Sequence, residues 1–133
     1  MKDSIYYNLY NLYSNTSDKN ICTKQFTSKS QDPNVWGPQF WYMLHNGAAH
    51  YPDNPSLICK QSMEGFINGI PVMLPCEECS IHANSFIKSV DIDKVVRNRN
   101  NLFEFFYMFH NEVNKRLGKP IVTLNQVKNM YGI

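Results

Sequence analysis

The sequence predicts an all-α fold, a bundle of four helices followed by a short fifth helix. In several separate segments apolar residues recur at intervals of three and four, which is the helical period. No segment alternates with the period of two that marks a β-strand, and no internal repeat is present. The connections between segments are short and rich in Pro, Gly and Asp. We therefore expect one domain over residues 32–133, preceded by an extension over residues 1–31.

The extension contains a short helical pattern and then a polar stretch, residues 14–31, rich in Ser, Asn, Lys and Thr. Such a composition is typical of a mobile arm. Cys22 is the only cysteine in this arm. A lone thiol here is either incidental or, beside a redox site, a shuttle that carries electrons inward.

The first helix of the domain is predicted to start near Pro38, which suits a first helical turn, and to end at Tyr51-Pro52. Its apolar stripe, spaced by three and four, consists of Phe40, Trp41, Leu44, His45, Ala48 and Ala49. Trp41 and His45 lie one turn apart on the same face. By residue type alone they read as a core tryptophan with a histidine at its edge.

The second helix follows the turn at residues 52–55, with Ser56 as its N-cap. Its buried stripe is expected to contain Met63, Phe66, Ile67 and Ile70. Gly65, Gly69 and Pro71 weaken helical structure, so this helix is expected to bend or fray before Pro75. Cys59, near its start, reads as a small buried hydrophobic residue.

Cys76 and Cys79 begin the third predicted helix, over residues 77–88. Their spacing places both sulfurs on one face of a helix N-terminus, where the helix dipole and free N–H groups favour a thiolate. Two such thiols can close and reopen a small disulfide ring, which is the chemistry of thiol–disulfide exchange. The same spacing is half of a zinc site, with His82 as a third ligand. The residues of this motif favour neither reading.

Residues 91–101 are expected to form a polar loop, and the fourth helix to run over residues 102–117 before Gly118-Lys119-Pro120 ends it. Its apolar stripe is Leu102, Phe105, Phe106, Phe109 and Val113. An adjoining stripe combines aromatic and polar residues, Phe103, Tyr107, His110 and Asn114, which a purely structural helix does not need. Thr123 is expected to cap a short fifth helix that ends near Tyr131.

The overall composition narrows the function. A formal net charge of +2 without a Lys/Arg run gives no support for binding to nucleic acid or anionic membranes. No apolar stretch has the length of a membrane span, and the first residues lack the pattern of a secretory signal. Four cysteines in this setting favour catalytic or metal-binding thiols over structural disulfides. The 18 aromatic residues exceed the needs of a small core, and a flat cofactor would use them.

Three separated motifs resemble those of the FAD-linked sulfhydryl oxidases, the family of augmenter of liver regeneration with yeast, plant and large-DNA-virus members. They are Trp36-Gly37-x-x-x-Trp41-x-x-Leu44-His45, then Pro75-Cys76-x-x-Cys79-x-x-His82, and His110-Asn111-x-Val113-Asn114-x-x-Leu117-Gly118-Lys119-Pro120. Their order and spacing also agree with the family. The resemblance covers about residues 35–131 and favours the redox reading over zinc, with no metal at the site.

The resemblance implies an enzyme that forms disulfide bonds in dithiol substrates and passes the electrons through FAD to O2, giving H2O2. Cys76 and Cys79 would be the catalytic disulfide, with Cys76 meeting the substrate thiolate and Cys79 nearer FAD. The positions that would hold FAD between the helices are Gly37, Trp41, His45, Cys79, His82, His110, Asn111, Val113, Asn114, Lys115, Lys119 and Tyr131. Cys22 would be a possible shuttle.

The chain also departs from the family pattern. Cellular members carry a Cys-x16-Cys disulfide around the third motif, where this chain has Tyr107 and Leu124. The residue before the motif proline is often aromatic in the family but is Leu74 here, and no second Cys-x-x-Cys is present. This economy of cysteines resembles that of short viral members. Two alternatives remain: a zinc-binding interaction module that adds Cys59 to the ligands, and an inactive FAD-binding scaffold.

The resemblance also implies partners and a location. The expected partners are a protein dithiol substrate, such as a thioredoxin-like carrier, molecular oxygen, and a second copy of the chain in a homodimer. Neither nucleic acid nor a membrane span is expected. A viral source would place the protein in the host cytoplasm or the virion, and a cellular source in the mitochondrial intermembrane space.

Overall fold

The computed structural model describes residues 31–133, which contain helices and, within that range, no strand. The all-α prediction is therefore confirmed. The elements are α2 (Pro33–Ala49), α3 (Leu57–Met73), α4 (Glu77–Lys88), α5 (Ile92–Val95), α6 (Arg99–Arg116) and α7 (Leu124–Met130). Apart from Gln31, the expected extension with Cys22 lies outside the described residues.

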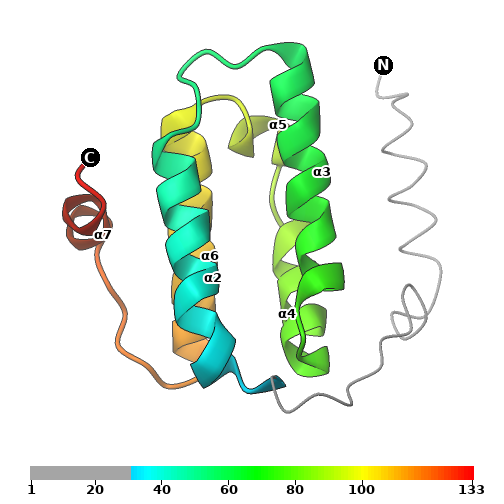
Figure 1. Cartoon of the computed structure of the whole chain (residues 1–133), viewed down its shortest axis with the longest axis vertical. Coiled ribbons are helices and arrows are strands. Elements are labelled where there is room, and N and C mark those ends of the chain that lie inside the picture. Colours follow the sequence, from blue (N-terminus) through cyan, green and yellow to red (C-terminus); the bar gives the residue numbers. More distant parts are fainter. Residues whose placement is uncertain (1–30) are drawn as a thin grey trace.

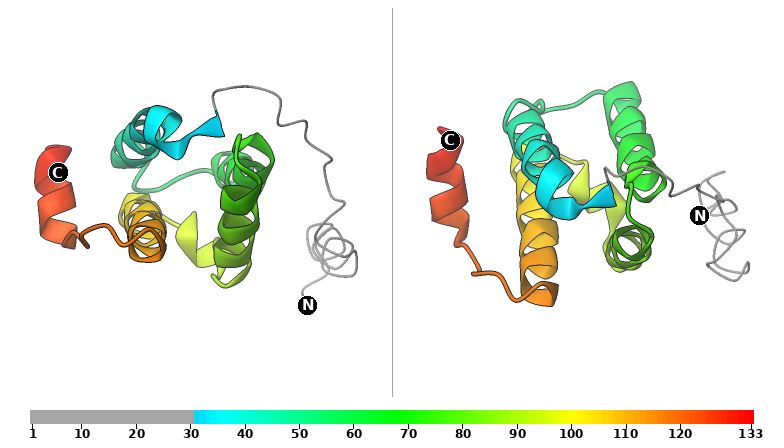
Figure 2. Two further views of the ribbon diagram at one scale, coloured as in Figure 1. Left: turned by 90° about the horizontal axis from the view of Figure 1, so that it is seen from below. Right: turned by 60° about the horizontal axis from the view of Figure 1, so that its bottom comes forward.

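The helices form two antiparallel pairs, α2 with α6 and α3 with α4 (Figure 1). The short helix α7 lies on the outer side of the α2–α6 pair, away from α3 and α4 (Figure 2). The first residues of α2 and α4 and the last residues of α6 meet at one end of the bundle (Figure 1). Cys76 and Cys79, at the start of α4, lie at this end.

The core is built mainly on α6, whose phenylalanines face the other helices. Phe103, Phe105, Phe106 and Phe109 are each almost completely buried, and Phe86 of α4 stacks on Phe109 with ring centroids 5.2 Å apart. Burying each such side chain contributes on the order of 2 kcal/mol to folding. The predicted apolar stripe of this helix is therefore its core face, and α6 is the central element of the bundle.

The start of α2 differs from the prediction. The helix begins at Pro33, five residues before Pro38, because Asp32 accepts a hydrogen bond from the backbone N–H of Asn34 and caps it there. Pro33 takes the first-turn position that suits proline. Pro38 instead lies inside the helix, which adds more than one turn to α2 and brings Trp36 and Gly37 onto it.

Two further differences concern α3 and the segment after α4. The expected weakening of α3 is not seen, because the helix continues through Pro71 to Met73 against α4. The expected loop over residues 91–101 contains the one-turn helix α5, and α6 begins at Arg99 with Asn98 as its N-cap. By contrast, the bounds of α4 agree with the prediction.

The end of α6 is held by a left-handed glycine. Gly118 has φ +67°, and the N–H of Lys119 returns to the carbonyl of Asn114 at 2.8 Å. Beyond it the chain runs to α7, which Thr123 and Gln126 start with a reciprocal capping box. The Asn111 side chain fixes this connection by exchanging two hydrogen bonds with the backbone of Val122, at 2.8 and 3.2 Å. None of the helices in this part of the chain is apolar enough over a sufficient length to cross a bilayer.

Candidate active site

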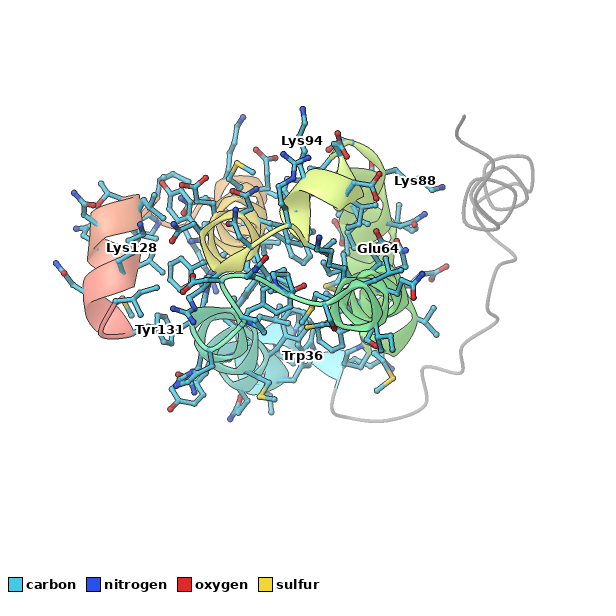
Figure 3. All side chains as sticks on the ribbon, turned by 90° about the horizontal axis from the view of Figure 1, so that it is seen from above. Trp36, Glu64, Lys88, Lys94, Lys128 and Tyr131 are labelled. Atoms are coloured by element: carbon cyan, nitrogen blue, oxygen red, sulfur yellow. A yellow bond between two sulfur atoms is a disulfide. The ribbon has the colours of Figure 1, made fainter. Side chains whose placement is uncertain are left out.

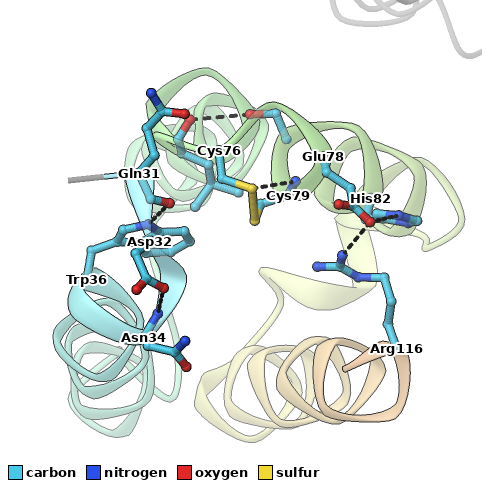
Figure 4. Close-up of a disulfide and its surroundings, with 11 residues drawn as sticks. Gln31, Asp32, Asn34, Trp36, Cys76, Glu78, Cys79, His82 and Arg116 are labelled. Carbon is cyan, nitrogen blue, oxygen red and sulfur yellow. Dashed lines mark hydrogen bonds and ion pairs between the residues drawn. A yellow bond between two sulfur atoms is a disulfide. The ribbon is translucent and has the colours of Figure 1, made fainter. Parts of the chain in front are cut away.

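A disulfide joins Cys76 and Cys79 at the start of α4, with their Cα atoms 5.1 Å apart (Figure 4). Cys76 is the N-cap residue, and its Sγ accepts a hydrogen bond from the backbone N–H of Cys79 at 3.2 Å. The helix dipole and this donor favour negative charge on the Cys76 sulfur once the bond is reduced. The two cysteines therefore form a disulfide at a helix N-terminus, which is where the sequence places them.

The two sulfurs differ in accessibility. Cys79 is only 9% exposed and lines a cavity, whereas Cys76 is partly exposed at the end of the bundle. An incoming thiolate meets Cys76 more readily than Cys79. A group bound in the cavity would lie on the side of Cys79.

The cavity has a volume of about 330 Å³, at the lower end of the size range of ligand pockets. It lies where α2, the start of α4 and the end of α6 meet. Its walls are mostly aromatic and apolar, with two cationic side chains and few other polar groups. The lining residues are Pro33, Asn34, Trp36, Gly37, Pro38, Phe40, Trp41, Tyr42, Leu74, Cys79, Phe109, His110, Val113, Asn114, Arg116, Leu117, Lys119 and Tyr131.

A stacked pair of rings, Trp41 and His110, forms part of the wall. Their centroids are 4.0 Å apart and their planes differ by 3°. Behind them, His45 is 1% exposed, and its Nε2 lies 2.9 Å from Nδ1 of His110 in a hydrogen bond. Tyr131 reaches back from α7 toward α2 (Figure 3), and its ring lies 5.3 Å from that of His45. The four rings thus form one polar-edged aromatic cluster.

Burial determines the charge of this cluster. Burial first, and the neighbouring His110 second, lower the pKa of His45 to about 4. The pKa of His110 is also lowered to about 4, by burial first and by Lys119 second. Both imidazoles are therefore neutral at pH 7. Nδ1 of His45 is buried without a hydrogen-bond partner among the described residues, so one polar atom beside the cavity wall is left unsatisfied.

The positive charges come from the end of α6. Arg116 is the last residue of the helix, and Lys119 is placed by the turn at Gly118. Nη1 of Arg116 contacts Oε1 of Glu78 at 3.3 Å, which links α6 to α4 beside the disulfide (Figure 4). The cavity therefore combines flat aromatic faces with two cations, a combination suited to an aromatic ligand that carries anionic groups.

The structure brings most of the sequence-predicted site residues together. Those that line the cavity are Gly37, Trp41, Cys79, His110, Val113, Asn114, Lys119 and Tyr131. His45 lies directly behind the wall. The other three are not part of the lining: His82 is half-exposed and faces Glu78, Asn111 holds the connection to α7, and Lys115 is exposed.

Sequence reasoning missed several lining residues, of which Asn34, Tyr42 and Arg116 are polar. Asn34 was missed because the helix was expected to begin after it. Tyr42 and Arg116 carry no local signal, since their place in the wall depends on how α2 and α6 pack. Trp36 belongs to the first motif, and its indole N–H donates to the carbonyl of Gln31 at 3.1 Å.

Cys59 does not join the disulfide. It is a free cysteine near the start of α3, where its thiol interacts with Tyr51, and it is partly rather than fully buried. It is separated from the end of α3 by about 20 Å of helix, from the rise per residue. Within residues 31–133 no group of three or more His, Cys, Asp or Glu side chains is placed to hold a metal ion. The geometry thus gives no support to a zinc site that uses Cys59.

Comparisons with known proteins agree with this geometry. Residues 38–132 match the sequence profile of the Erv1 / Alr family. A putative FAD-linked sulfhydryl oxidase of Invertebrate iridescent virus 3 is 49% identical over 104 residues, covering 78% of this chain and 70% of the relative. The yeast Erv1 core superposes with a TM-score of 0.71 at 27% identity, covering 86% of this chain and 96% of that one. The FAD-binding domain of Erv1 from Saccharomyces cerevisiae gives a TM-score of 0.70 at 30% identity, covering 75% and 93%.

Proposed function

The chain belongs to the Erv1 / Alr family, and we propose on that basis that it is an FAD-linked sulfhydryl oxidase, which oxidises dithiols to disulfides. One observation carries the proposal. The disulfide joins Cys76, a partly exposed residue, to Cys79, which is 9% exposed and lines an aromatic and cationic cavity. A thiol substrate and a bound cofactor can therefore reach opposite sides of the same bond.

The cavity residues fit FAD in their chemistry. The rings of Trp41, His110 and Tyr131 offer flat faces and edges for an aromatic ring system. Arg116 and Lys119 supply positive charge for the pyrophosphate. Nδ1 of His45 finds no hydrogen-bond partner among residues 31–133, so a polar atom of a bound cofactor could supply one. Neutral histidines add hydrogen-bonding groups without adding charge.

The protein's own step is a thiol–disulfide exchange. A substrate thiolate attacks Sγ of Cys76, forms a mixed disulfide and releases Cys79 as a thiolate. A second substrate thiol then attacks the mixed disulfide and releases Cys76. The substrate leaves as a disulfide, and its two electrons and two protons remain on the Cys76–Cys79 dithiol.

FAD held in the cavity beside Cys79 would supply the two-electron transfer from this dithiol to O2 that restores the disulfide and gives H2O2. The burial of Cys79 keeps its sulfur against the cavity and away from bulk thiols. The N-cap position of Cys76 stabilises the thiolate that leaves when the mixed disulfide is resolved. The two cysteines are therefore not interchangeable.

Absorption and oxygen uptake test the proposal directly. The purified protein should show an absorption band at about 450 nm, which is a property of oxidised flavin. It should also consume oxygen when dithiothreitol is added. C76S and C79S should keep the flavin band and lose oxygen uptake, while C59S, which removes a thiol outside the site, should keep both. A colourless protein that FAD does not reconstitute, or substantial turnover by C76S or C79S, contradicts the proposal. Bound zinc in a colourless protein would favour the metal alternative.

The natural substrate is proposed to be a protein dithiol such as a thioredoxin-like carrier. The partial exposure of Cys76 supports this, because a folded carrier has to bring its own sulfur to the surface of this chain. C79S leaves Cys76 as the only thiol of the pair, and this thiol should attack the disulfide of the oxidised carrier, forming a mixed disulfide and releasing one carrier thiolate. If C79S traps no more protein than the C76S/C79S double variant, the carrier proposal is wrong.

Cys22 is proposed as a shuttle between substrate and Cys76. C22S should then lower the rate with a protein substrate and leave the rate with dithiothreitol unchanged. Equal rates for C22S and the unmodified chain with both substrates would make Cys22 incidental.

The homodimer also belongs to this proposal. α3 exposes Ile58, Phe66 and Met73 to solvent, so the prediction that Phe66 belongs to its buried stripe was wrong. Pairing through the first helices of the domain would cover such apolar groups. Sedimentation should give twice the mass of one chain, and F66E should give the mass of one.

We propose that the protein acts in the host cytoplasm or the virion, which its likeness to the iridescent virus relative supports. Detection of the protein in mitochondria alone would favour the intermembrane space instead.

A further inference from the structure

Glu78 lies between the two redox cysteines in the sequence, within the first turn of α4. A negatively charged carboxylate in the same helical turn as the two cysteines opposes the formation of a thiolate on either sulfur. The structure places two basic side chains against it. Oε1 of Glu78 is 3.3 Å from Nη1 of Arg116 and 3.7 Å from Nε2 of His82 (Figure 4).

Arg116 is the more deeply placed member of the pair. Its side chain is 22% exposed against 73% for Glu78, and it lines the same cavity as Cys79. An ion pair with an exposed carboxylate contributes little to folding stability. A mostly buried guanidinium, however, is a fixed positive charge, and its field reaches the sulfurs with little screening by water.

We propose that Arg116 is a positioning residue that sets the reduction potential of the Cys76–Cys79 pair, by holding the Glu78 carboxylate and offsetting its charge. The inference rests on the proposed function and adds a residue to its redox step. Reduction breaks the S–S bond and adds two electrons to the pair. One proton is taken up if one of the sulfurs stays a thiolate, and two protons are taken up if both become thiols. The electrons come from the substrate dithiol, which becomes a disulfide. Positive charge nearby favours the reduced form that contains a thiolate.

This role predicts opposite effects for the two ends of one ion pair. R116Q removes the guanidinium charge and leaves only His82 beside the Glu78 carboxylate, so the equilibrium with dithiothreitol should shift toward the disulfide by about three- to tenfold. E78Q removes the opposing charge, so the equilibrium should shift toward the dithiol by a similar factor. A tenfold shift corresponds to about 30 mV for a two-electron couple. The double variant R116Q/E78Q should lie close to the unmodified chain.

Two variants provide matched controls. K115Q removes the same charge from the neighbouring position of α6, at an exposed side chain that does not line the cavity, and should shift the equilibrium by less than twofold. R116K keeps the charge but not the planar donor group, and should recover part of the effect of R116Q.

The assay equilibrates the full chain with its FAD in dithiothreitol redox buffers without oxygen. The thiols are then trapped with a mass label, and the peptide that contains Cys76 and Cys79 is scored by mass spectrometry. Opposite shifts for R116Q and E78Q support the proposal. Shifts of the same sign, or a shift for R116Q no larger than that for K115Q, overturn it. Because the measurement follows the dithiol itself, a chain that fails to consume oxygen still gives a result, so the two proposals can fail separately.

Discussion

Acidification should destabilise the apoprotein through its buried histidines. Burial lowers the pKa of His45 from its ordinary 6.5 to about 4. Between these two values the unfolded chain binds a proton at this imidazole and the native chain does not. A basic group with a lowered native pKa contributes stability that is complete above 6.5 and is lost as the pH falls toward 4.

The magnitude follows from the same two values. At pH 5 the unfolded imidazole is almost fully protonated and the native one is mostly neutral. Integrating the difference in bound protons from pH 7.5 to pH 5 gives a loss of about 2 kcal/mol in the free energy of unfolding for His45 alone. His110, whose pKa is lowered to a similar value, adds a further loss. The two rings are hydrogen-bonded to each other, so their contributions are not simply additive.

The assay is urea unfolding of the FAD-free protein at several pH values, followed by circular dichroism. H45F is the matched control, because it keeps a buried aromatic ring and removes one titrating group. The loss of stability between pH 7.5 and 5 should be smaller in H45F than in the unmodified chain by about 2 kcal/mol. Titrating groups that do not contact His45 are the same in both proteins and cancel in the comparison, whereas His110 stays in both but loses its hydrogen bond to residue 45 in H45F. If both proteins lose the same free energy, burial does not hold His45 neutral and the reasoning is refuted.

Three further outcomes are expected. N111L removes both hydrogen bonds to Val122, so it should lower the free energy of unfolding by about 1–3 kcal/mol. N111L should also weaken FAD binding, because it loosens the connection to α7 and so displaces Tyr131 from the cavity wall. An unchanged affinity in a titration with FAD would mean that the position of α7 does not affect the site. G118A puts a side chain on a residue with φ +67°, so it should lower the free energy of unfolding in urea by about 1 kcal/mol. An unchanged free energy of unfolding would mean that the turn relaxes to another conformation. K119Q should weaken FAD binding and reduce its dependence on salt, as measured by flavin fluorescence at two ionic strengths; an unchanged salt dependence would place Lys119 away from the phosphates.

The parts of the fold that local signals specify could be predicted. The bounds of α4 follow from Pro75, the N-capping Cys76 and the helix-tolerant run after it. The Thr123 cap and the glycine stop after α6 were recognised in the same way. The start of α2 was not, because Pro33 and Pro38 both suit a first turn, and only the hydrogen bond at Asp32 decides between them.

The site could be predicted only where residue type and spacing carry the information. The apolar and polar stripes of α6 indicated His110 and Asn114, and the motif gave both cysteines. For Trp41 and His45, residue type alone favoured a core pair. His45 is indeed buried, but Trp41 also forms part of the cavity wall. The contact between Glu78 and Arg116 joins residues 38 positions apart. Such a contact depends on the packing of α4 against α6, and no local pattern indicates it.

The connection between α6 and α7 is noncovalent within the part of the chain that the structure describes. The side-chain amide of Asn111 exchanges two hydrogen bonds with the backbone of Val122, and the only disulfide within residues 31–133 is Cys76–Cys79. Reduction of that disulfide therefore breaks no bond that holds α7 on α6. Tyr131, which follows α7, can keep its place in the cavity wall in both redox states of the pair.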